Sequence, residues 1–336
     1  MSHRNNGKSL GRRGFLKAAA ASVAGAASAT MLPGTARAAS RGEELATLHN
    51  LAECIGCGAC VDACREENSF KFPEPEKPFP TMYPSRVPVA DWSTEEGRAV
   101  DDRLTPYNWL YIQTAEVEYE GETYEINIPR RCMHCQNPPC ADLCPWGAAG
   151  REANGIVRIN EKVCLGGSKC KSVCPWKIPE RQTGVGLYLD LLPSLAGNGV
   201  MYKCDRCHHR IAEGEVPACV DGCPFEVQTI GPREEIVAMA HELAESMNGF
   251  IYGETENGGT NTLYVSPVPF ELLNEAVETG PGKPHLAQVK DMMGQDENLG
   301  YAAMLAPVAG IAGAALTLAG KARKTARKAG DGEEEA

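Results

Sequence analysis

The sequence predicts an α+β protein in which two interleaved cysteine-rich units with inserts are followed by one C-terminal transmembrane helix. Three observations predict this fold. The 15 cysteines of the 336-residue chain fall into four groups separated by long cysteine-free stretches, short strand and helix patterns lie between the groups, and an uncharged apolar segment stands near the C-terminus. A chain of this length has room for two small domains and appendages.

The N-terminal segment indicates export. Arg12-Arg13 form a twin-arginine pattern, an apolar run rich in Ala follows over 18–32, and the Ala-Arg-Ala of 36–38 suits cleavage. We therefore predict a twin-arginine signal peptide over 1–38. A retained membrane anchor is the alternative, although the apolar run is shorter than the ~20 residues that a span needs. Twin-arginine export carries folded proteins, which suits a protein whose metal centres are built in the cytoplasm.

The C-terminal segment indicates a membrane anchor. Residues 302–320 contain no charged side chain, and a basic group follows at once, made of Lys321, Arg323, Lys324, Arg327 and Lys328. This pattern predicts a transmembrane helix over 301–320 and a cytoplasmic tail over 321–336. Residues 39–300 would then lie on the periplasmic face of the bacterial inner membrane. A buried amphipathic helix and a loose Ala-rich tail are the alternatives.

The charge of the chain limits its partners. The sequence has 33 Lys and Arg against 44 Asp and Glu, a formal charge of −11. Residues 1–38 hold six of these basic residues and no acidic one, so their removal changes the charge to −17. Because nucleic-acid phosphates require basic patches, we expect no nucleic-acid partner.

The cysteine groups carry the main functional signal. Their spacings are C-x2-C-x2-C-x3-C, C-x2-C-x4-C-x3-C-P, C-x5-C-x3-C-P and C-x2-C-x11-C-x3-C-P. In chain order the members are Cys54, Cys57, Cys60 and Cys64; Cys132, Cys135, Cys140 and Cys144; Cys164, Cys170 and Cys174; and Cys204, Cys207, Cys219 and Cys223. We refer to them as the first to fourth groups.

Three chemistries compete for these cysteines. Disulfides are common outside the cytoplasm, but the odd total leaves one cysteine over, and four sulfurs within eleven residues make a poor framework. Structural zinc uses paired C-x2-C units that are usually a dozen or more residues apart. Three closely spaced cysteines with a fourth after three intervening residues are typical of two-cluster ferredoxins. We therefore predict iron–sulfur clusters and electron transfer, with every cysteine a ligand of cluster iron.

The groups predict two bis-cluster ferredoxin-like domains. The second and third groups are about twenty residues apart and are joined by the strand-like segment 155–159, so they form a compact unit over 131–180. The first group, with an insert, lies in 39–130. The fourth group and a C-terminal extension lie in 181–300. The segments 39–130 and 181–300 must then pair to form the second unit.

At this point the chain resembles the four-cluster electron-transfer subunits of bacterial respiratory oxidoreductases. The resemblance covers residues 45–270 and includes the stretch 252–260, in which Tyr252-Gly253-Glu254 precede Gly258-Gly259. It is strongest to the hydrogenase-2-type and high-molecular-mass cytochrome c complex subunits, and it extends to the formate dehydrogenase β subunit. The resemblance implies electron transfer between a periplasmic catalytic subunit (a hydrogenase or molybdopterin enzyme) or multihaem cytochrome and a quinone-reactive membrane subunit. The alternatives are a cluster-containing oxidoreductase with its own active site and a soluble ferredoxin carrier.

The resemblance also implies which cysteines share a cluster. The implied sets are Cys54, Cys57, Cys60 and Cys223 for the first cluster; Cys132, Cys135, Cys140 and Cys174 for the second; Cys164, Cys170 and Cys144 for the third; and Cys204, Cys207, Cys219 and Cys64 for the fourth. Gly167 stands where the family usually has another cysteine of the third set. We expect a 3Fe-4S cluster there and three 4Fe-4S clusters elsewhere. The alternative is a 4Fe-4S cluster with water or the Ser168 hydroxyl on the odd iron.

Several other side chains stand near cysteines. His134 could tune a cluster potential or be a surface histidine, and we do not expect His208 or His209 to bind metal. Trp146 and Trp176 could shield clusters or simply pack.

Three further segments have recognisable patterns. The proline-rich segment 73–88 predicts an extended excursion. Residues 111–119 and 123–128 predict a hairpin, and residues 232–243 predict a helix with Pro232 in its first turn.

Overall fold

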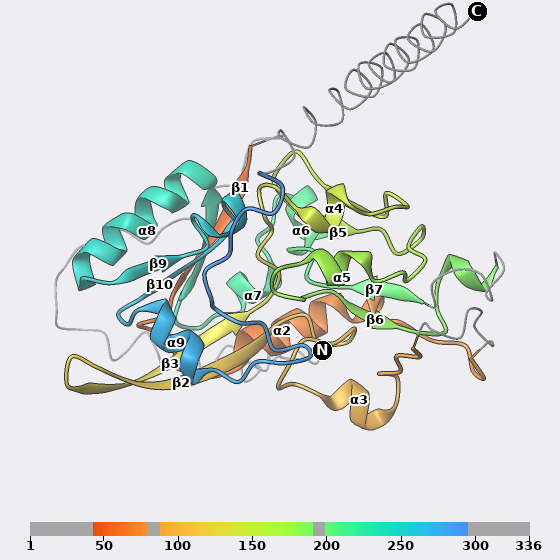
Figure 1. The fold of residues 1–336 in the computed structure, drawn as a ribbon, viewed down its shortest axis with the longest axis horizontal. Coiled ribbons are helices and arrows are strands. Elements are labelled where there is room, and N and C mark those ends of the chain that lie inside the picture. The colour runs from red at the N-terminus through yellow and green to blue at the C-terminus, as the bar shows by residue number, and fades with distance from the viewer. Residues whose placement is uncertain (1–42, 80–87, 191–198, 295–336) are drawn as a thin grey trace, which may run out of the picture. The chain divides into compact units, whose positions relative to one another are not determined.

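The computed structural model describes residues 43–79, 88–190 and 199–294, which belong to one compact unit (Figure 1). Within these residues no helix is both long enough and apolar enough to cross a membrane. The predicted signal peptide, the transmembrane helix at 301–320 and the tail that follows it all lie outside the described residues.

A four-stranded sheet organises the chain. Its strand order is β8 (Gln228–Pro232), β1 (Leu45–Asn50), β10 (Thr262–Ser266) and β9 (Phe250–Tyr252). Strand β1 runs parallel to β10, with Thr47 opposite Thr262, and antiparallel to β8. Because side chains alternate along a strand, the two faces of this sheet bury different sets of residues.

Helix α8 (Arg233–Met247) covers one face of the sheet, as Figure 1 shows. A separate apolar core joins them, made of Ala46, Leu48, Leu263 and Val265 from the sheet and Ile236, Ala240 and Ala244 from the helix. The predicted helix is confirmed and runs beyond residue 243 to Met247, where Asn248 adopts a left-handed conformation. Pro232 caps the helix and is not in its first turn, because it pairs with Leu45 as the last residue of β8.

The other face of the sheet meets the cysteine-bearing part of the chain. Helix α2 (Ala59–Asn68) follows the loop of the first group and packs against α7 (Ala218–Asp221) of the fourth group. The contact is close at Gly222, where an added Cβ would stand 2.6 Å from the Cβ of Ala63. Similarly, α4 (Pro139–Asp142) of the second group packs against α5 (Lys169–Val173) of the third group.

Three two-stranded ribbons lead into the cysteine groups. The predicted hairpin is confirmed as β2 (Tyr111–Tyr119) and β3 (Glu122–Arg130), with positive φ at Glu120 and Gly121 in the turn. The predicted strand at 155–159 forms as β5 (Val157–Ile159) and pairs with β4 (Ala149–Arg151). Strands β6 (Glu180–Gln182) and β7 (Val200–Tyr202) form the third ribbon.

The remaining elements are short. They are the helices α3 (Glu95–Ala99), α6 (His208–Ala212) and α9 (Phe270–Ala276) and the 3₁₀ turns η1 (Ser69–Lys71), η2 (Leu187–Leu189) and η3 (Glu256–Gly258). Residues 73–79 contain no helix or strand, as the prolines predict, and 80–87 lie outside the described residues. Helix α9 packs against β2, and α3 lies in the insert, where Thr94 caps it by accepting a hydrogen bond from Gly97.

Candidate iron–sulfur centres

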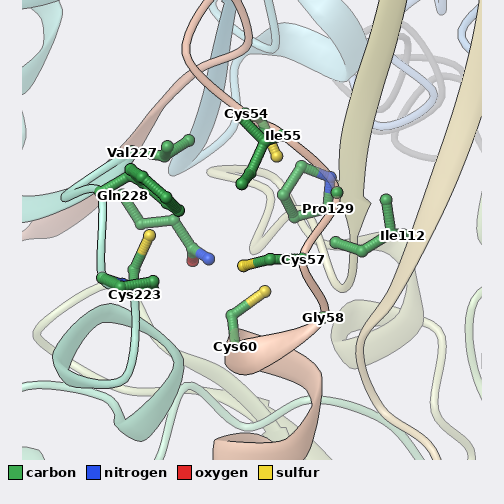
Figure 2. Close-up of a pocket in the computed structure, with 13 residues that line it drawn as sticks. Cys54, Ile55, Cys57, Gly58, Cys60, Ile112, Pro129, Cys223, Val227 and Gln228 are labelled. Atoms are coloured by element: carbon green, nitrogen blue, oxygen red, sulfur yellow. The ribbon is translucent and has the colours of Figure 1, made fainter. Parts of the chain in front are cut away.

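Each of the 15 cysteines is free, and the structure gathers their sulfurs from distant segments. Cys54, Cys57, Cys60 and Cys223 line one small pocket that is partly open to solvent, and Figure 2 shows their sulfurs pointing into it. The loop there turns through Gly56, where an added Cβ would stand 2.6 Å from Oδ1 of Asn127. A glycine is therefore required at this position.

A second set of thiols lies deeper. Burial raises the pKa of Cys64 well above its usual value, and Cys219, Cys204 and Cys207 add to the rise, so these four sulfurs are close neighbours. Asn68 extends its side-chain amide toward two of them, with Nδ2 3.8 Å from Sγ of Cys64 and 3.7 Å from Sγ of Cys207. All four cysteines are buried.

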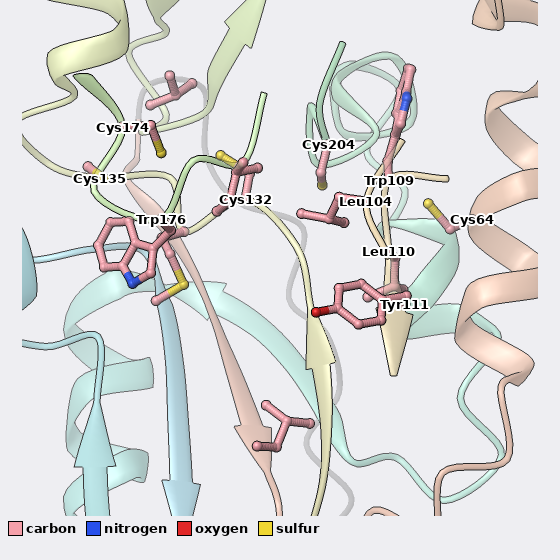
Figure 3. Close-up of a cluster of buried hydrophobic side chains, with 14 of the residues drawn as sticks. Cys64, Leu104, Trp109, Leu110, Tyr111, Cys132, Cys135, Cys174, Trp176 and Cys204 are labelled. Atoms are coloured by element: carbon pink, nitrogen blue, oxygen red, sulfur yellow. The ribbon is translucent and has the colours of Figure 1, made fainter. Parts of the chain in front are cut away.

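The second and third groups also exchange members. Burial raises the pKa of Cys135, and Cys174, Cys132 and Cys140 contribute. Figure 3 shows Cys132, Cys135 and Cys174 among the buried side chains. In the same way Cys164 and Cys144 add to the effect of burial on Cys170, whose pKa rises to about 12. The neighbours in each case include members of the set that the resemblance implied, and some also cross between sets, as Cys219 does beside Cys60 and Cys174 beside Cys170. Their assignment as iron ligands stays a prediction.

The third set has a vacant position beside it. An added Cβ at Gly167 would meet no atom within 4 Å, and the backbone there is not left-handed. The neighbouring Ser168 hydroxyl accepts a hydrogen bond of 3.1 Å from Nη1 of Arg181 and lies 3.3 Å from Sδ of Met201. Sγ of Cys164 accepts from the backbone N–H of Met201 at 3.4 Å.

The protonation of these thiols depends on iron. Burial, with Cys219, Cys223 and Cys54 nearby, raises the pKa of Cys60 to about 12, and burial raises that of Cys174 to about 11. Without metal such thiols stay protonated at neutral pH, whereas coordination to iron removes the proton. In the described part of the chain no three His, Cys, Asp or Glu side chains converge as one metal ion would require. The ligands of an iron–sulfur cluster bind several iron atoms, so they do not converge on one point.

Two basic residues inside this core were not foreseen from the sequence. Nη1 of Arg131 donates to Sγ of Cys219 at 2.8 Å, and Nζ of Lys203 lies 3.4 Å from Sγ of Cys132. Neither forms an ion pair with a carboxylate of the described residues. Thiolates that are bound to iron would supply the missing negative charge, so the donor set fits a cluster. The available signal was that each basic residue directly precedes a group's first cysteine.

The histidines and tryptophans have varied environments. The surface interpretation of His134 is wrong: the side chain is fully buried, and its Nδ1 accepts from the N–H of Val157 at 3.0 Å. Trp176 is buried and donates from Nε1 to the Tyr252 hydroxyl at 2.8 Å. Trp146, in contrast, is 59% exposed, so packing within the described part of the chain does not explain it. His209 lies beside a carboxylate, with its Nε2 2.8 Å from Oε1 of Glu67.

Comparison with known proteins agrees with this geometry. Two family models match, both described as 4Fe-4S dicluster domains, over residues 53–148 and 124–233. The formate dehydrogenase-O iron-sulfur subunit of Escherichia coli (strain K12) is 30% identical over 230 positions, covering 66% of this chain and 67% of that subunit. The chain belongs to the family of iron–sulfur electron-transfer subunits of oxidoreductases. Members of this family carry 4Fe-4S clusters in ferredoxin-like dicluster domains of mixed α and β content, and this chain has two such domains.

Two further relatives show how far the similarity extends. The hydrogenase-2 operon protein HybA of Escherichia coli O157:H7 is 28% identical over 310 positions, which cover 79% of this chain and 83% of that protein. A protein of Nitratidesulfovibrio vulgaris is 31% identical over 267 positions, which cover 76% of this chain. The chain spans 65% of the length of that second relative.

Proposed function

We propose that this chain is the electron-transfer subunit of a periplasmic membrane-bound oxidoreductase and that it holds four clusters in the spatial order first, fourth, second, third. Three links in the chain support this order. Helix α2 carries Cys60 of the first set and Cys64 of the fourth, one turn apart. Lys203 lies 3.4 Å from Sγ of Cys132 in the second set and donates to the carbonyl of Cys204 in the fourth at 3.1 Å.

The third link is α5. It holds Cys170 of the third set and ends at Cys174 of the second. Bound clusters would pass single electrons between neighbouring sites. The observation that carries the proposal is that each set of cysteines is linked to the next by a short segment or a shared contact. Electron transfer along a series of clusters needs each cluster to lie beside the next.

The two ends of this series reach the surface, whereas the inner sets are buried. At the first set Cys57 is exposed, and Ile55 and Phe225 are 61% and 48% exposed beside it. Near the third set Leu143, Trp146 and Val163 are exposed apolar side chains. We infer that one end docks a catalytic subunit (a hydrogenase or molybdopterin enzyme) or a multihaem cytochrome. The other end docks an integral membrane subunit that reacts with quinone.

The third set supports a 3Fe-4S cluster, with 4Fe-4S clusters at the other three sets. Cys144 and Cys164 lie near Cys170 there, and Gly167 supplies no side chain. The Ser168 hydroxyl is engaged by Arg181, which argues against it as a ligand of a fourth iron.

Location forms part of the same proposal. The twin-arginine pattern at Arg12-Arg13 supports export of the folded protein, and the apolar segment 302–320 with its basic flank supports an anchor whose tail faces the cytoplasm.

Purification of the tagged protein from native membranes tests the function. We expect iron and acid-labile sulfide in the protein, and co-purification of a catalytic or cytochrome subunit with an integral membrane subunit. A protein that contains zinc and little iron, or that leaves the membrane alone in a salt wash, would contradict the proposal. A tagged Cys207→Ser variant provides a relay test: the end cluster beside the donor should still be reduced, while reduction of the cluster at the opposite end is slowed.

A further inference from the structure

Two of the buried cations between the inner sets of cysteines contact a sulfur. The side chains of Arg131 and Lys203 belong to residues that are 1% and 6% exposed, and in the described part of the chain no carboxylate pairs with either. A buried charge without a partner is costly, so each must be balanced by another group. Among the groups that touch them is one sulfur each, Cys219 for Arg131 and Cys132 for Lys203.

The contacts cross between the two halves of the protein. Strand β3 leads to Arg131, which precedes Cys132 of the second set, yet its guanidinium reaches Cys219 of the fourth. Strand β7 leads to Lys203, which precedes Cys204 of the fourth set, yet its ammonium reaches Cys132 of the second. Arg131 therefore acts on the fourth set, although the next residue, Cys132, belongs to the second. Lys203 acts on the second set, although the next residue, Cys204, belongs to the fourth.

Each charge acts mainly on the set that it contacts, although the charge of Arg131 also opposes the rise in the pKa of Cys60 in the first set. The thiols that raise the pKa of Arg131, against the opposing effect of burial, are Cys219, Cys204 and Cys64, all of the fourth set. For Lys203 the corresponding thiols are Cys132 and Cys140 of the second set, followed by Cys204. The ammonium is also fixed in place, because it donates to the carbonyls of Val157 and Cys204.

Arg131 has a support of its own. Its Nη2 lies 3.1 Å from Nε2 of His49 on β1, and the imidazole of His49 stacks against the ring of Tyr264 on β10 with centroids 4.8 Å apart. His49 is fully buried, and burial and the neighbouring arginines hold its pKa well below the usual value. A neutral imidazole accepts a hydrogen bond at Nε2, so it orients the guanidinium toward Cys219.

We propose that Arg131 and Lys203 tune the inner relay, Arg131 raising the reduction potential of the fourth cluster and Lys203 that of the second, with His49 as the positioning residue for Arg131. The inference rests on the proposed function. Reduction adds one electron to an anionic cluster, so a nearby fixed positive charge stabilises the reduced form. These two centres lie in the middle of the proposed series, where the two domains join.

The test is a redox titration of the purified complex, followed by electron paramagnetic resonance. Wild-type protein must first show four cluster signals and the expected iron, and failure at this step would overturn the proposed function itself. Cys207→Ser and Cys135→Ser identify the signals of the fourth and second clusters. Arg131→Gln should then favour the oxidised fourth cluster about tenfold, which is a shift of about 59 mV to lower potential for a one-electron couple. Lys203→Met should do the same to the second cluster and shift the fourth cluster less.

Matched variants separate tuning from general damage. Arg130→Gln removes an equally buried cation that donates to the carbonyl of His285 and contacts no sulfur, so all four potentials should stay unchanged. Arg131→Lys keeps the charge and should restore most of the potential. If Arg131→Gln does not assemble, His49→Phe, which leaves the charge but removes its support, should lower the fourth potential alone. Potentials that do not move, or that move equally in all four clusters, would overturn the inference.

Discussion

Gly167 is the residue at which the family spacing and this chain differ, and the backbone there has room for a thiol. Because no atom lies within 4 Å of a Cβ built at this position, Gly167→Cys should fold without strain. We expect the variant to bind one more iron per chain than wild type, since thiolate is the ligand that iron–sulfur clusters prefer. The spectrum of an oxidised 3Fe-4S cluster, about one spin per chain in wild type by cluster stoichiometry, should disappear.

Gly167→Ala is the matched control for this experiment. It adds the same Cβ without sulfur, so it should keep both the wild-type iron content and the 3Fe-4S signal. If wild-type protein already contains a fourth iron at this site, the assignment is wrong. Ser168→Ala would then show whether the hydroxyl that Arg181 now engages is the ligand.

At the scale of single residues, the cysteines could be predicted as candidate cluster ligands, whereas the contacts of the basic residues beside them could not. Cysteine spacing within one stretch of chain carries the geometry of a cluster, so the groups are visible in the sequence. The role of Arg131 depends on a contact with Cys219, 88 positions away, which no local pattern encodes. His134 was ambiguous for a similar reason, because the N–H of Val157 that it accepts from belongs to β5, a separate segment of the chain.

Among the elements, helix α8 offers a change that should affect stability alone. Ile236 is fully buried between α8 and the sheet, on the face that does not carry His49 and Tyr264. Ile236→Ala should therefore lower the free energy of unfolding by about 2–4 kcal/mol, as for other large-to-small core substitutions. The cluster potentials should not change, because the substituted side chain belongs to a separate core.

Anaerobic thermal unfolding and redox titration of the same sample measure both effects. Met239→Ala serves as the control, since Met239 is a partly exposed residue of the same helix and its truncation should cost less than half as much. A large change in any cluster potential on Ile236→Ala would show that the two faces of the sheet are coupled.

The elements that could be predicted are those whose pattern is local. The hairpin at 111–130 has alternating residues around Glu120-Gly121, and α8 has an apolar face that repeats along one helix. Strands β1 and β10 have no such pattern, because both of their faces are buried and one carries polar residues such as Thr47 and Thr262. Their parallel pairing connects distant parts of the chain, so only the folded structure reveals it.

For the whole molecule, the metal content tests the cluster assignment directly. Three 4Fe-4S clusters and one 3Fe-4S cluster require about 15 iron and about 16 acid-labile sulfide per chain. Iron and sulfide assays on anaerobically purified protein measure both quantities. A count near half of these values, with all 15 cysteines intact, would indicate that only one dicluster domain is filled.

The anchor makes a second prediction at this scale. A chain that is truncated after Asn298 should be exported and should retain its clusters, but it should no longer sediment with membranes. The measurement is fractionation of cells that lack the partner subunits, with the full-length chain as control. Sedimentation of the truncated chain in such cells would contradict the membrane role of 302–320.

The position of β1 between β8 and β10 means that β1 is synthesised well before the strands with which it pairs. Thr47 pairs with Thr262, a residue more than 200 positions later, and His49 pairs with Gln228. At a synthesis rate of about 5–20 residues per second, β1 leaves the ribosome roughly 10–40 s before its parallel neighbour. Cys223 is synthesised within that interval, so for most of it Cys54, Cys57 and Cys60 have no Cys223 beside them. A cluster held by these four cysteines would therefore be completed only after Cys223 has left the ribosome.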